Sequence, residues 1–452
     1  MRTPSLESYE NPLAQEMGQR LSELFPRWWI LEQARASGFV ERVRNLDPMV
    51  FLGHLVLAFG SLSHLCLLQL HRSHQKVAPD QMSWPAFYDR FTPELLEFLK
   101  RCLERAMARV VFEALPARET ESLEACDIRE IVAIDSTLIP LHPDLAESFP
   151  NARSTTCPAA AKLNVQLGLL NRAPRAFSIS SGKTAESPLL PTEAWMEGHL
   201  LLFDLGYFKI ERFREIDDSG GFFISRLKTN SNPLLLRSLR EGPGNRIDLR
   251  HWRLREVEPY LRRQVLDAEG FFAPSNITDK KVREIEEDPA FRPLRFVGVK
   301  NEKTGEYHLY VTHLPADKVS PEEIADLYRA RWAVEIFFKE LKSHFGLSSI
   351  GSGKKHIVEI VICVALLTVI VSGQVRRELE KEPRSDVKEM GPLIYAEHFH
   401  HISTGLLQAV LYHEGFLFDP ASLWIGAIRA DPLPEHYRRG RLEDVYRQRE
   451  PN

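Results

Sequence analysis

Residues 320–346 read SPEEIADLYRARWAVEIFFKELKSHFG, and this stretch decides how the rest of the chain is interpreted. Both of its ends carry helix signals. Ser320 can cap the first turn, Pro321 suits the first helical position, and Glu323 completes a capping box. Gly346 follows the last apolar residue and can take the left-handed conformation that ends a helix. We therefore predict a single helix from Ser320 to Gly346.

This helix should have two distinct faces, because successive residues are rotated by about 100°. One face is an apolar stripe that we expect to be buried: Leu327, Ala330, Val334, Phe337, Phe338, Leu341 and Phe345. A narrow arc beside it carries Tyr328, Arg331, Glu335 and Lys342. A carboxylate flanked by cations and a phenol could bind a metal ion and phosphates together. The alternative is a solvated face with ion pairs three and four residues apart.

Bulk composition narrows the class of protein. The chain has 452 residues, which is enough for two or three domains and a large core. Its 44% apolar and 27% charged residues are typical of a soluble globular protein. The net charge of −4 means that any nucleic-acid contact must come from local patches. The five cysteines form no CxxC pair, which excludes a cysteine zinc site and a disulfide framework and favours a reducing compartment.

No targeting or membrane segment is expected. The first residues, MRTPSLESYENPL, lack an apolar signal core. The longest uncharged apolar run, Ile360–Gly373, is shorter than a membrane span, so we predict a buried helix from His356 to about Leu379. We expect the protein to be cytoplasmic.

From residue 129 the pattern changes to strands. Apolar or alternating runs predict strands at 131–134, 163–169, 177–179, 200–203, 221–227, 294–300 and 307–312. The first of these strands ends in Asp135 and the fourth ends in Asp204. If the two strands are neighbours in a sheet, the two carboxylates lie side by side at one edge. A single Asp after a strand is often only a loop start or a helix cap.

Positive charge is concentrated after the fifth strand. Residues 225–263 contain ten Lys or Arg against four acids, so 10 − 4 gives +6 in a chain whose total is −4. Partial alternation at 247–254 and 260–266 predicts an antiparallel β insertion. This insertion could grip phosphates, and a solvated basic sheet is the alternative.

The first 128 residues are expected to be helical. The segment 55–70 is strongly apolar, a short helix starts at Ser83, and Thr92-Pro93-Glu94 opens a helix toward Leu115. Short helices joined by tight turns suit a DNA-binding module, although most small helical domains have other roles.

With these residues in place, the chain resembles the DDE transposases of bacterial insertion sequences, specifically the insertion sequence 4 family. Three motifs carry the resemblance, which runs from about residue 130 to 346. The signature Tyr-xx-Arg-xxx-Glu-xxxxxx-Lys is matched by Tyr328, Arg331, Glu335 and Lys342, the Asp-[Ser/Gly]-[Ser/Thr] motif by Asp135, Ser136 and Thr137, and the Asp-x-Gly-Tyr motif by Asp204, Gly206 and Tyr207.

The resemblance implies an α/β fold: a ribonuclease H-like mixed sheet flanked by helices, interrupted by a β-rich insertion, with a helical N-terminal domain. The expected division is a DNA-binding helical domain at 1–128, the catalytic core at 129–228 and 308–382, a basic insertion at 229–307 and a tail at 383–452.

The resemblance also implies that Asp135, Asp204 and Glu335 are catalytic and bind two Mg²⁺ ions, with Mn²⁺ as a substitute. Two metals about 3.5–4 Å apart can activate a nucleophile and stabilise the leaving oxygen of a phosphodiester. Without metal, three clustered carboxylates would repel one another, so they should be strained or partly protonated. Three signature residues are expected to hold DNA phosphates: Tyr328, Arg331 and Lys342. Two further candidates to line the site are Lys162 and Glu186.

The implied function is cut-and-paste DNA transposition: cleavage at inverted-repeat ends and transfer of the freed 3′-hydroxyls into target DNA. The expected partners are double-stranded DNA and a second protomer in the DNA complex, in the nucleoid of a bacterial cytoplasm and away from membranes. One alternative is another nuclease or integrase on the same core. The other is a domesticated copy that binds DNA without cleaving it.

Overall fold

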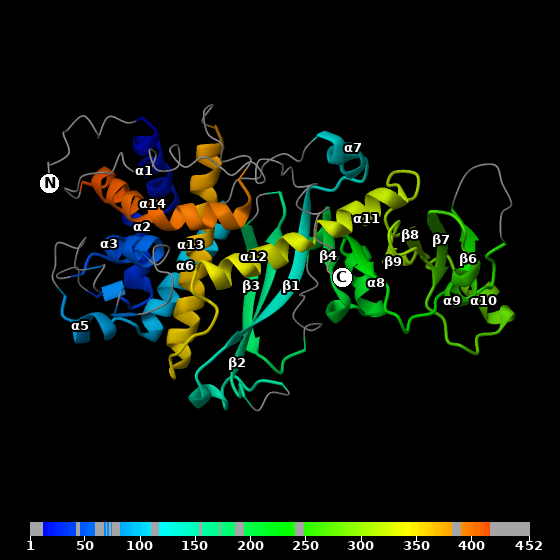
Figure 1. Cartoon of the computed structure of the whole chain (residues 1–452), viewed down its shortest axis with the longest axis horizontal. Helices are drawn as coiled ribbons and strands as arrows, with labels where there is room; N and C mark the ends of the chain where they lie inside the picture. Colours follow the sequence, from blue (N-terminus) through cyan, green and yellow to red (C-terminus); the bar gives the residue numbers. More distant parts are fainter. Residues whose placement is uncertain are drawn as a thin grey trace.

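A single nine-stranded sheet of order β3-β2-β1-β4-β5-β9-β8-β7-β6 organises the computed structural model (Figure 1). The strands are β1 (Glu130–Pro140), β2 (Ala160–Gly168), β3 (Ala173–Ser181), β4 (His199–Phe203), β5 (Phe222–Arg226), β6 (Leu234–Ser238), β7 (Val265–Phe271), β8 (Leu294–Lys300) and β9 (Tyr307–Thr312). The structure describes residues 12–41, 46–58, 67–68, 70–71, 74, 82–109, 117–152, 156–170, 173–185, 194–239, 248–381 and 390–415.

The first half of the sheet has the predicted core arrangement. Strands β3, β2 and β1 are antiparallel, whereas β4 and β5 follow β1 in parallel. All seven predicted strands are present, and the mixed sheet flanked by helices confirms the expected α/β class with its ribonuclease H-like core. The buried, apolar β4 sits between two parallel neighbours, as expected for a strand covered on both faces.

The second half of the sheet is the predicted β-rich insertion. It is antiparallel and continues the same sheet, because β9 pairs with β5. Two predicted strands in it are wrong. Residues 248–253 are irregular and lead into the short helix α9 (Leu254–Val257), where Glu256 accepts a hydrogen bond from the Arg253 N–H and so favours a turn. The other predicted strand, at 260–266, starts in the 3₁₀ turn η7 (Glu258–Tyr260), and β7 begins only at Val265.

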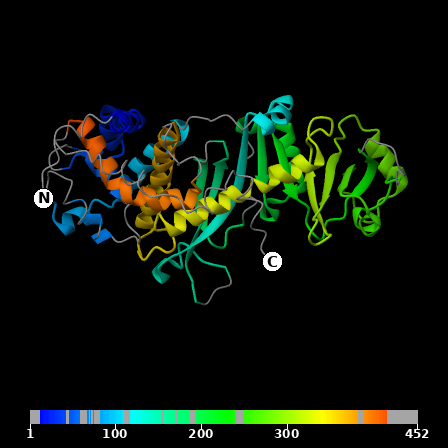
Figure 2. The same ribbon diagram turned by 45° about the horizontal axis from the view of Figure 1, so that its top comes forward.

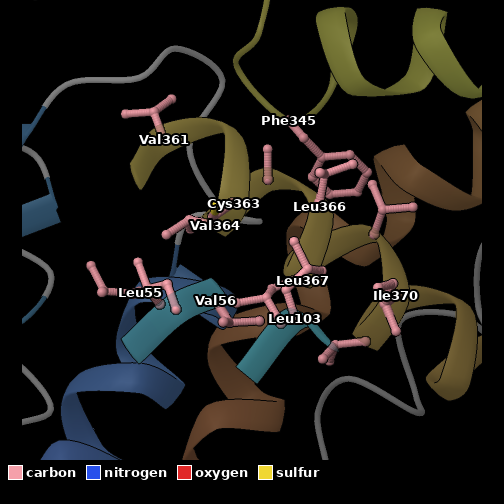
Figure 3. Close-up of a cluster of buried hydrophobic side chains, with 14 of the residues drawn as sticks. Leu55, Val56, Leu103, Phe345, Val361, Cys363, Val364, Leu366, Leu367 and Ile370 are labelled. Carbon is pink, nitrogen blue, oxygen red and sulfur yellow. The ribbon is translucent and has the colours of Figure 1, made fainter. Parts of the chain in front are cut away.

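Helices from both ends of the chain pack together at one end of the sheet (Figure 1). The N-terminal ones are α1 (Pro12–Leu24), α2 (Arg27–Ala36), α3 (Pro48–Gly53), the π-helical turn η2 (His54–Ala58), α5 (Trp84–Tyr88) and α6 (Pro93–Arg109). Helix α7 (Ala117–Ala125) lies apart from them, and its Leu123 packs in the core that contains Leu200 of β4 and Ile224 of β5. The C-terminal ones are α13 (Lys355–Lys381) and α14 (Pro392–His413). Figure 3 shows side chains of η2, α6 and α13 pointing toward one another in this shared core. The predicted domain boundaries stay a prediction.

Helix α13 forms the centre of that core. Among the described residues it is the one helix long and apolar enough to cross a membrane. However, 83% of its apolar window is buried inside the protein, and it packs along α6. This confirms the predicted buried helix.

Residues 320–346 fold as two helices, so the prediction of one continuous helix is wrong. Helix α11 (Pro321–Arg329) has the predicted capping box at Ser320 and Glu323. Helix α12 (Trp332–Ser343) follows after a tight turn in which the Arg331 N–H bonds to the Tyr328 carbonyl. The chain then turns at Gly346 with φ of 67°, as predicted.

Because of the bend between them, α11 and α12 pack against different parts of the protein. Helix α11 packs on β5, β7 and β8, whereas α12 packs on β1, α13 and α14. Both views show the two helices almost end to end across the sheet (Figures 1 and 2). The remaining helical elements are η3 (Pro143–Leu145), η5 (Ala194–Met196), η6 (Leu205–Tyr207), α8 (Ile210–Asp218) and α10 (Asp279–Glu286).

Candidate active site

Strand register brings the two predicted aspartates together. Ile134 of β1 pairs in parallel with Phe203 of β4, so Asp135 and Asp204 occupy the next positions on adjacent strands. Adjacent strands lie about 4.8 Å apart. Asp204 precedes η6 but makes no side-chain capping hydrogen bond, so the alternative role of a helix cap is not seen. The predicted adjacency of β1 and β4 is confirmed, and it sets the two aspartates on neighbouring chain segments.

Arg331 connects Asp135 of β1 to Glu335 of α12. Its Nη1 donates to Oδ2 of Asp135 at 3.0 Å, and its Nη2 donates to Oε1 of Glu335 at 2.5 Å. The Arg331 side chain is only 12% exposed, while Asp135 is 20% and Glu335 33% exposed. The arc on α12 therefore faces the middle of β1 at Asp135 and is not a solvated ion-pair surface.

Burial dominates the electrostatics of this site. It raises the pKa of Asp135 from 3.8 to about 6. The hydrogen bond from the Ser136 N–H and the charge of Arg331 act to lower this pKa, whereas the charges of Glu335 and Asp204 act to raise it. The expected partial protonation is thus present, but desolvation contributes more to it than carboxylate repulsion does. Burial opposes the charge on Arg331, yet its neighbours Tyr328, Glu335 and Asp135 together raise its pKa. Arg331 is therefore a permanent cation.

Tyr328 lies inside the protein, beneath the acidic groups. It is 7% exposed, its ring packs 5.2 Å from that of Tyr310, and its hydroxyl donates to the Phe203 carbonyl at 3.5 Å. Burial raises the pKa of this phenol, so it stays neutral. Since Phe203 immediately precedes Asp204, Tyr328 braces the end of β4.

Lys342 lies two turns after Glu335 on α12. It is half-buried, and burial lowers the pKa of its ammonium group. It forms no salt bridge with any residue that the structure describes. This cation is therefore placed beside the acidic arc without a carboxylate of its own.

Lys162, one of the two weaker candidates, starts from the face of the sheet opposite to Asp135. Lys162 pairs with Leu138 across β1 and β2, and strand alternation places it on the face opposite to Asp135. Its Nζ donates to the Thr184 carbonyl at 2.6 Å. Its role in the site stays a prediction, and the face it starts from is decided by the two-residue period of β2. Glu186 lies outside the described residues.

Two polar pairs that support the site were missed at the level of sequence. The Tyr207 hydroxyl donates to Oδ1 of Asn164 at 3.0 Å and so ties the turn after Asp204 to β2. The buried guanidinium of Arg295 bonds both carboxylate oxygens of Asp267 at 2.8 Å. Arg295 also donates to the Val319 carbonyl just before α11. Single polar residues inside apolar strands, such as Asn164 and Arg295, were the available signal.

The donor set suits a hard divalent cation. Carboxylate oxygens are the ligands that Mg²⁺ and Ca²⁺ prefer, and Asp135 is electrostatically coupled to both Asp204 and Glu335. In this conformation no three His, Cys, Asp or Glu side chains of the described part of the chain form a group ready to hold a metal. The Arg331 guanidinium is paired with both Asp135 and Glu335 in this conformation.

Comparison with known proteins is consistent with this arrangement. Residues 127–370 match the family model described as the transposase DDE domain. The chain is 23% identical over 433 residues to the transposase for insertion sequence element IS1151 of Clostridium perfringens, covering 88% of this chain and 89% of that protein. It is 24% identical over 379 residues to the transposase for insertion sequence element IS231B of Bacillus thuringiensis subsp. berliner, covering 77% of each. A solved piggyBac transposase synaptic complex with hairpin DNA aligns with a TM-score of 0.44 and 12% identity, covering 100% of this chain and 88% of that one.

Proposed function

Because the chain belongs to the family of transposases with a DDE domain, we propose that it cuts DNA at the inverted-repeat ends of an insertion sequence and joins the freed 3′-hydroxyls to target DNA. We also propose that it belongs to the insertion sequence 4 group, on the basis of the four-residue signature Tyr328, Arg331, Glu335 and Lys342 and the two aspartate motifs. The observation that supports this proposal most is the pair of contacts from Arg331 to Asp135 of β1 and to Glu335 of α12, with Asp204 directly after the neighbouring strand β4.

In this proposal the three carboxylates hold two Mg²⁺ ions. When bound, such ions activate the attacking hydroxyl and stabilise the leaving oxygen of the phosphodiester. Asp135 and Asp204 approach from adjacent strands, and Glu335 closes the site from α12. Their partial burial keeps bulk water away, which strengthens every electrostatic interaction in the site.

The remaining signature residues divide between DNA contact and support. Lys342 serves as a point charge for a backbone phosphate, and Arg331 offers a planar fork for phosphate oxygens. Tyr328 braces the Phe203 carbonyl from inside and thereby holds Asp204 in place. We assign Tyr328 to support because it is buried and not at the DNA surface.

Several broader features complete the proposal. The exposed Arg and Lys of the insertion, including Arg237 and Arg262, supply phosphate contacts beyond the cut site. Two protomers pair the two ends of the element, and the enzyme works in the bacterial cytoplasm on nucleoid DNA.

The test is a cleavage assay on DNA that carries the two genomic flanks of the gene, including any short inverted repeats. With Mg²⁺ we expect nicks at the repeat boundaries, followed by joining of the 3′ ends to a second duplex, and no reaction in EDTA. Nicks at random positions would favour a general nuclease on the same core. Tight binding to the repeats without any cleavage in Mg²⁺ or Mn²⁺ would favour a domesticated copy.

A further inference from the structure

We propose that Arg331 takes the place of the metal ions in the DNA-free protein and that a DNA phosphate draws it away, so that DNA binding opens the acidic site to divalent cations. This inference rests on the proposed function, since it concerns the same three carboxylates. It makes Arg331 a positioning residue that acts through Asp135 and Glu335.

The first step is geometric. One guanidinium donates to two different carboxylates, Asp135 at 3.0 Å and Glu335 at 2.5 Å. A cation bound by both carboxylates needs the same oxygens and the space between them. A guanidinium and a divalent ion cannot occupy that space together.

The second step is electrostatic. In the DNA-free protein the positive charge of Arg331 offsets the repulsion between the carboxylates that flank it. The same charge repels an incoming metal ion at short range. Arg331 thereby stabilises the clustered carboxylates in the DNA-free protein and prevents them from binding divalent cations.

The third step concerns what can release Arg331. Its side chain forms ion pairs with Asp135 and Glu335 and lies 5.9 Å from the Tyr328 ring, at the turn where α11 ends and α12 begins. A backbone phosphate offers two oxygens that satisfy a guanidinium fork as well as carboxylates do. Next to it along the chain, Trp332 is 38% exposed, so the start of α12, where Arg331 lies, is open to a bound strand.

Thermodynamic linkage gives the proposal a quantitative form. If DNA removes Arg331 from the carboxylates, DNA raises the affinity for the metal, and the metal raises the affinity for DNA by the same factor. Couplings of this kind are about 5- to 150-fold. Without the Arg331 charge, both effects should vanish.

The experiment measures Mn²⁺ binding by the free Mn²⁺ signal in electron paramagnetic resonance, at constant pH and ionic strength. The proteins are wild type, Arg331→Met and Arg331→Lys, with Arg329→Met as the matched control because Arg329 is an exposed arginine paired only locally with Asp326. Each is titrated alone and with a duplex that stops at the end of the element, so that no cleavable bond remains.

We expect the duplex to raise the Mn²⁺ affinity of wild type and of Arg329→Met by about 5- to 150-fold. Arg331→Met should bind Mn²⁺ without DNA as tightly as wild type does with DNA, and the duplex should no longer change that affinity. Arg331→Lys, which keeps the charge but cannot span both carboxylates, should lie between the two.

A DNA-free Arg331→Met protein that binds Mn²⁺ no better than wild type would overturn the proposal. If that variant does not fold by circular dichroism, an Arg331→Lys protein identical to wild type in both titrations has the same consequence. The DNA-free comparison uses no DNA and no cleavage. A chain that cuts no DNA would therefore refute the proposed function, while this inference is decided separately.

Discussion

The carboxylate of Asp135 accepts a hydrogen bond from Arg331 at 3.0 Å, although the two residues lie 196 positions apart in the chain. This contact docks the start of α12 onto the middle of β1, and the Tyr328 hydroxyl docks the end of α11 onto Phe203 of β4. Because Glu335 lies one turn beyond Arg331, the same docking brings its carboxylate to the side of Arg331 away from Asp135.

Removing the buried carboxylate of Asp135 should change how stability depends on pH. The pKa of Asp135 in the folded protein, about 6, lies above the ordinary aspartate value of 3.8 expected in the unfolded chain. The folded protein therefore holds this proton more tightly than the unfolded chain does. Stability is therefore lost as the pH rises from about 4 to about 6, by at most about 3 kcal/mol. Asp135→Asn should escape this loss.

The measurement is urea unfolding in EDTA between pH 4 and pH 7.5. The free energy of unfolding of Asp135→Asn minus that of wild type should rise across this range and level off above about pH 6. Glu322→Gln, which removes an exposed carboxylate on α11, is the matched control for a lost negative charge. A difference that stays constant with pH would show that Asp135 is not desolvated in the folded protein.

The buried ion pair of Arg295 and Asp267 should stabilise the fold, because Arg295 also bonds the Val319 carbonyl just before α11. Asp267→Asn leaves the Arg295 guanidinium buried without its carboxylate, which typically costs about 3–5 kcal/mol. The matched control is Glu269→Gln, whose partner Arg237 is 68% exposed, so its loss should cost less than about 1 kcal/mol. Chemical unfolding of both variants checks the ranking, and equal losses would contradict the role assigned to the pair.

Lys342 should contact DNA through its charge alone. Lys342→Ala is expected to weaken binding to every duplex by a similar factor and to reduce the slope of log K against log salt by about 1. Fluorescence anisotropy over a range of salt concentrations measures both quantities. The same slope as wild type would mean that Lys342 touches no phosphate.

Much of the core could be predicted from the sequence, because its signals are local. Apolar runs ending in Asp135 and Asp204 marked β1 and β4, and the capping box at Ser320 marked the start of α11. The break at Arg331 could not be predicted, because it depends on α11 and α12 packing against different elements.

The same limit applies to the supporting residues. Lys162 lies between the two aspartates along the chain, yet the face of β2 on which it starts is decided by the register with β1. Tyr328 belongs to the polar arc by spacing, but it is buried because Tyr310 and the end of β4 meet it from the sheet. The contact between Arg331 and both carboxylates is also tertiary, so spacing alone indicated its neighbourhood but not its partners.

The most direct test of the account compares Glu335→Gln with Glu322→Gln on DNA carrying the ends of the element. Loss of a metal ligand should cost more than the 10- to 100-fold typical of residues that only support such ligands, so we expect cleavage by Glu335→Gln to fall by at least about 100-fold. Binding of the ends should change little, and Glu322→Gln should cleave like wild type. Cleavage by Glu335→Gln at the wild-type rate would contradict the claim that Asp135, Asp204 and Glu335 form one catalytic site.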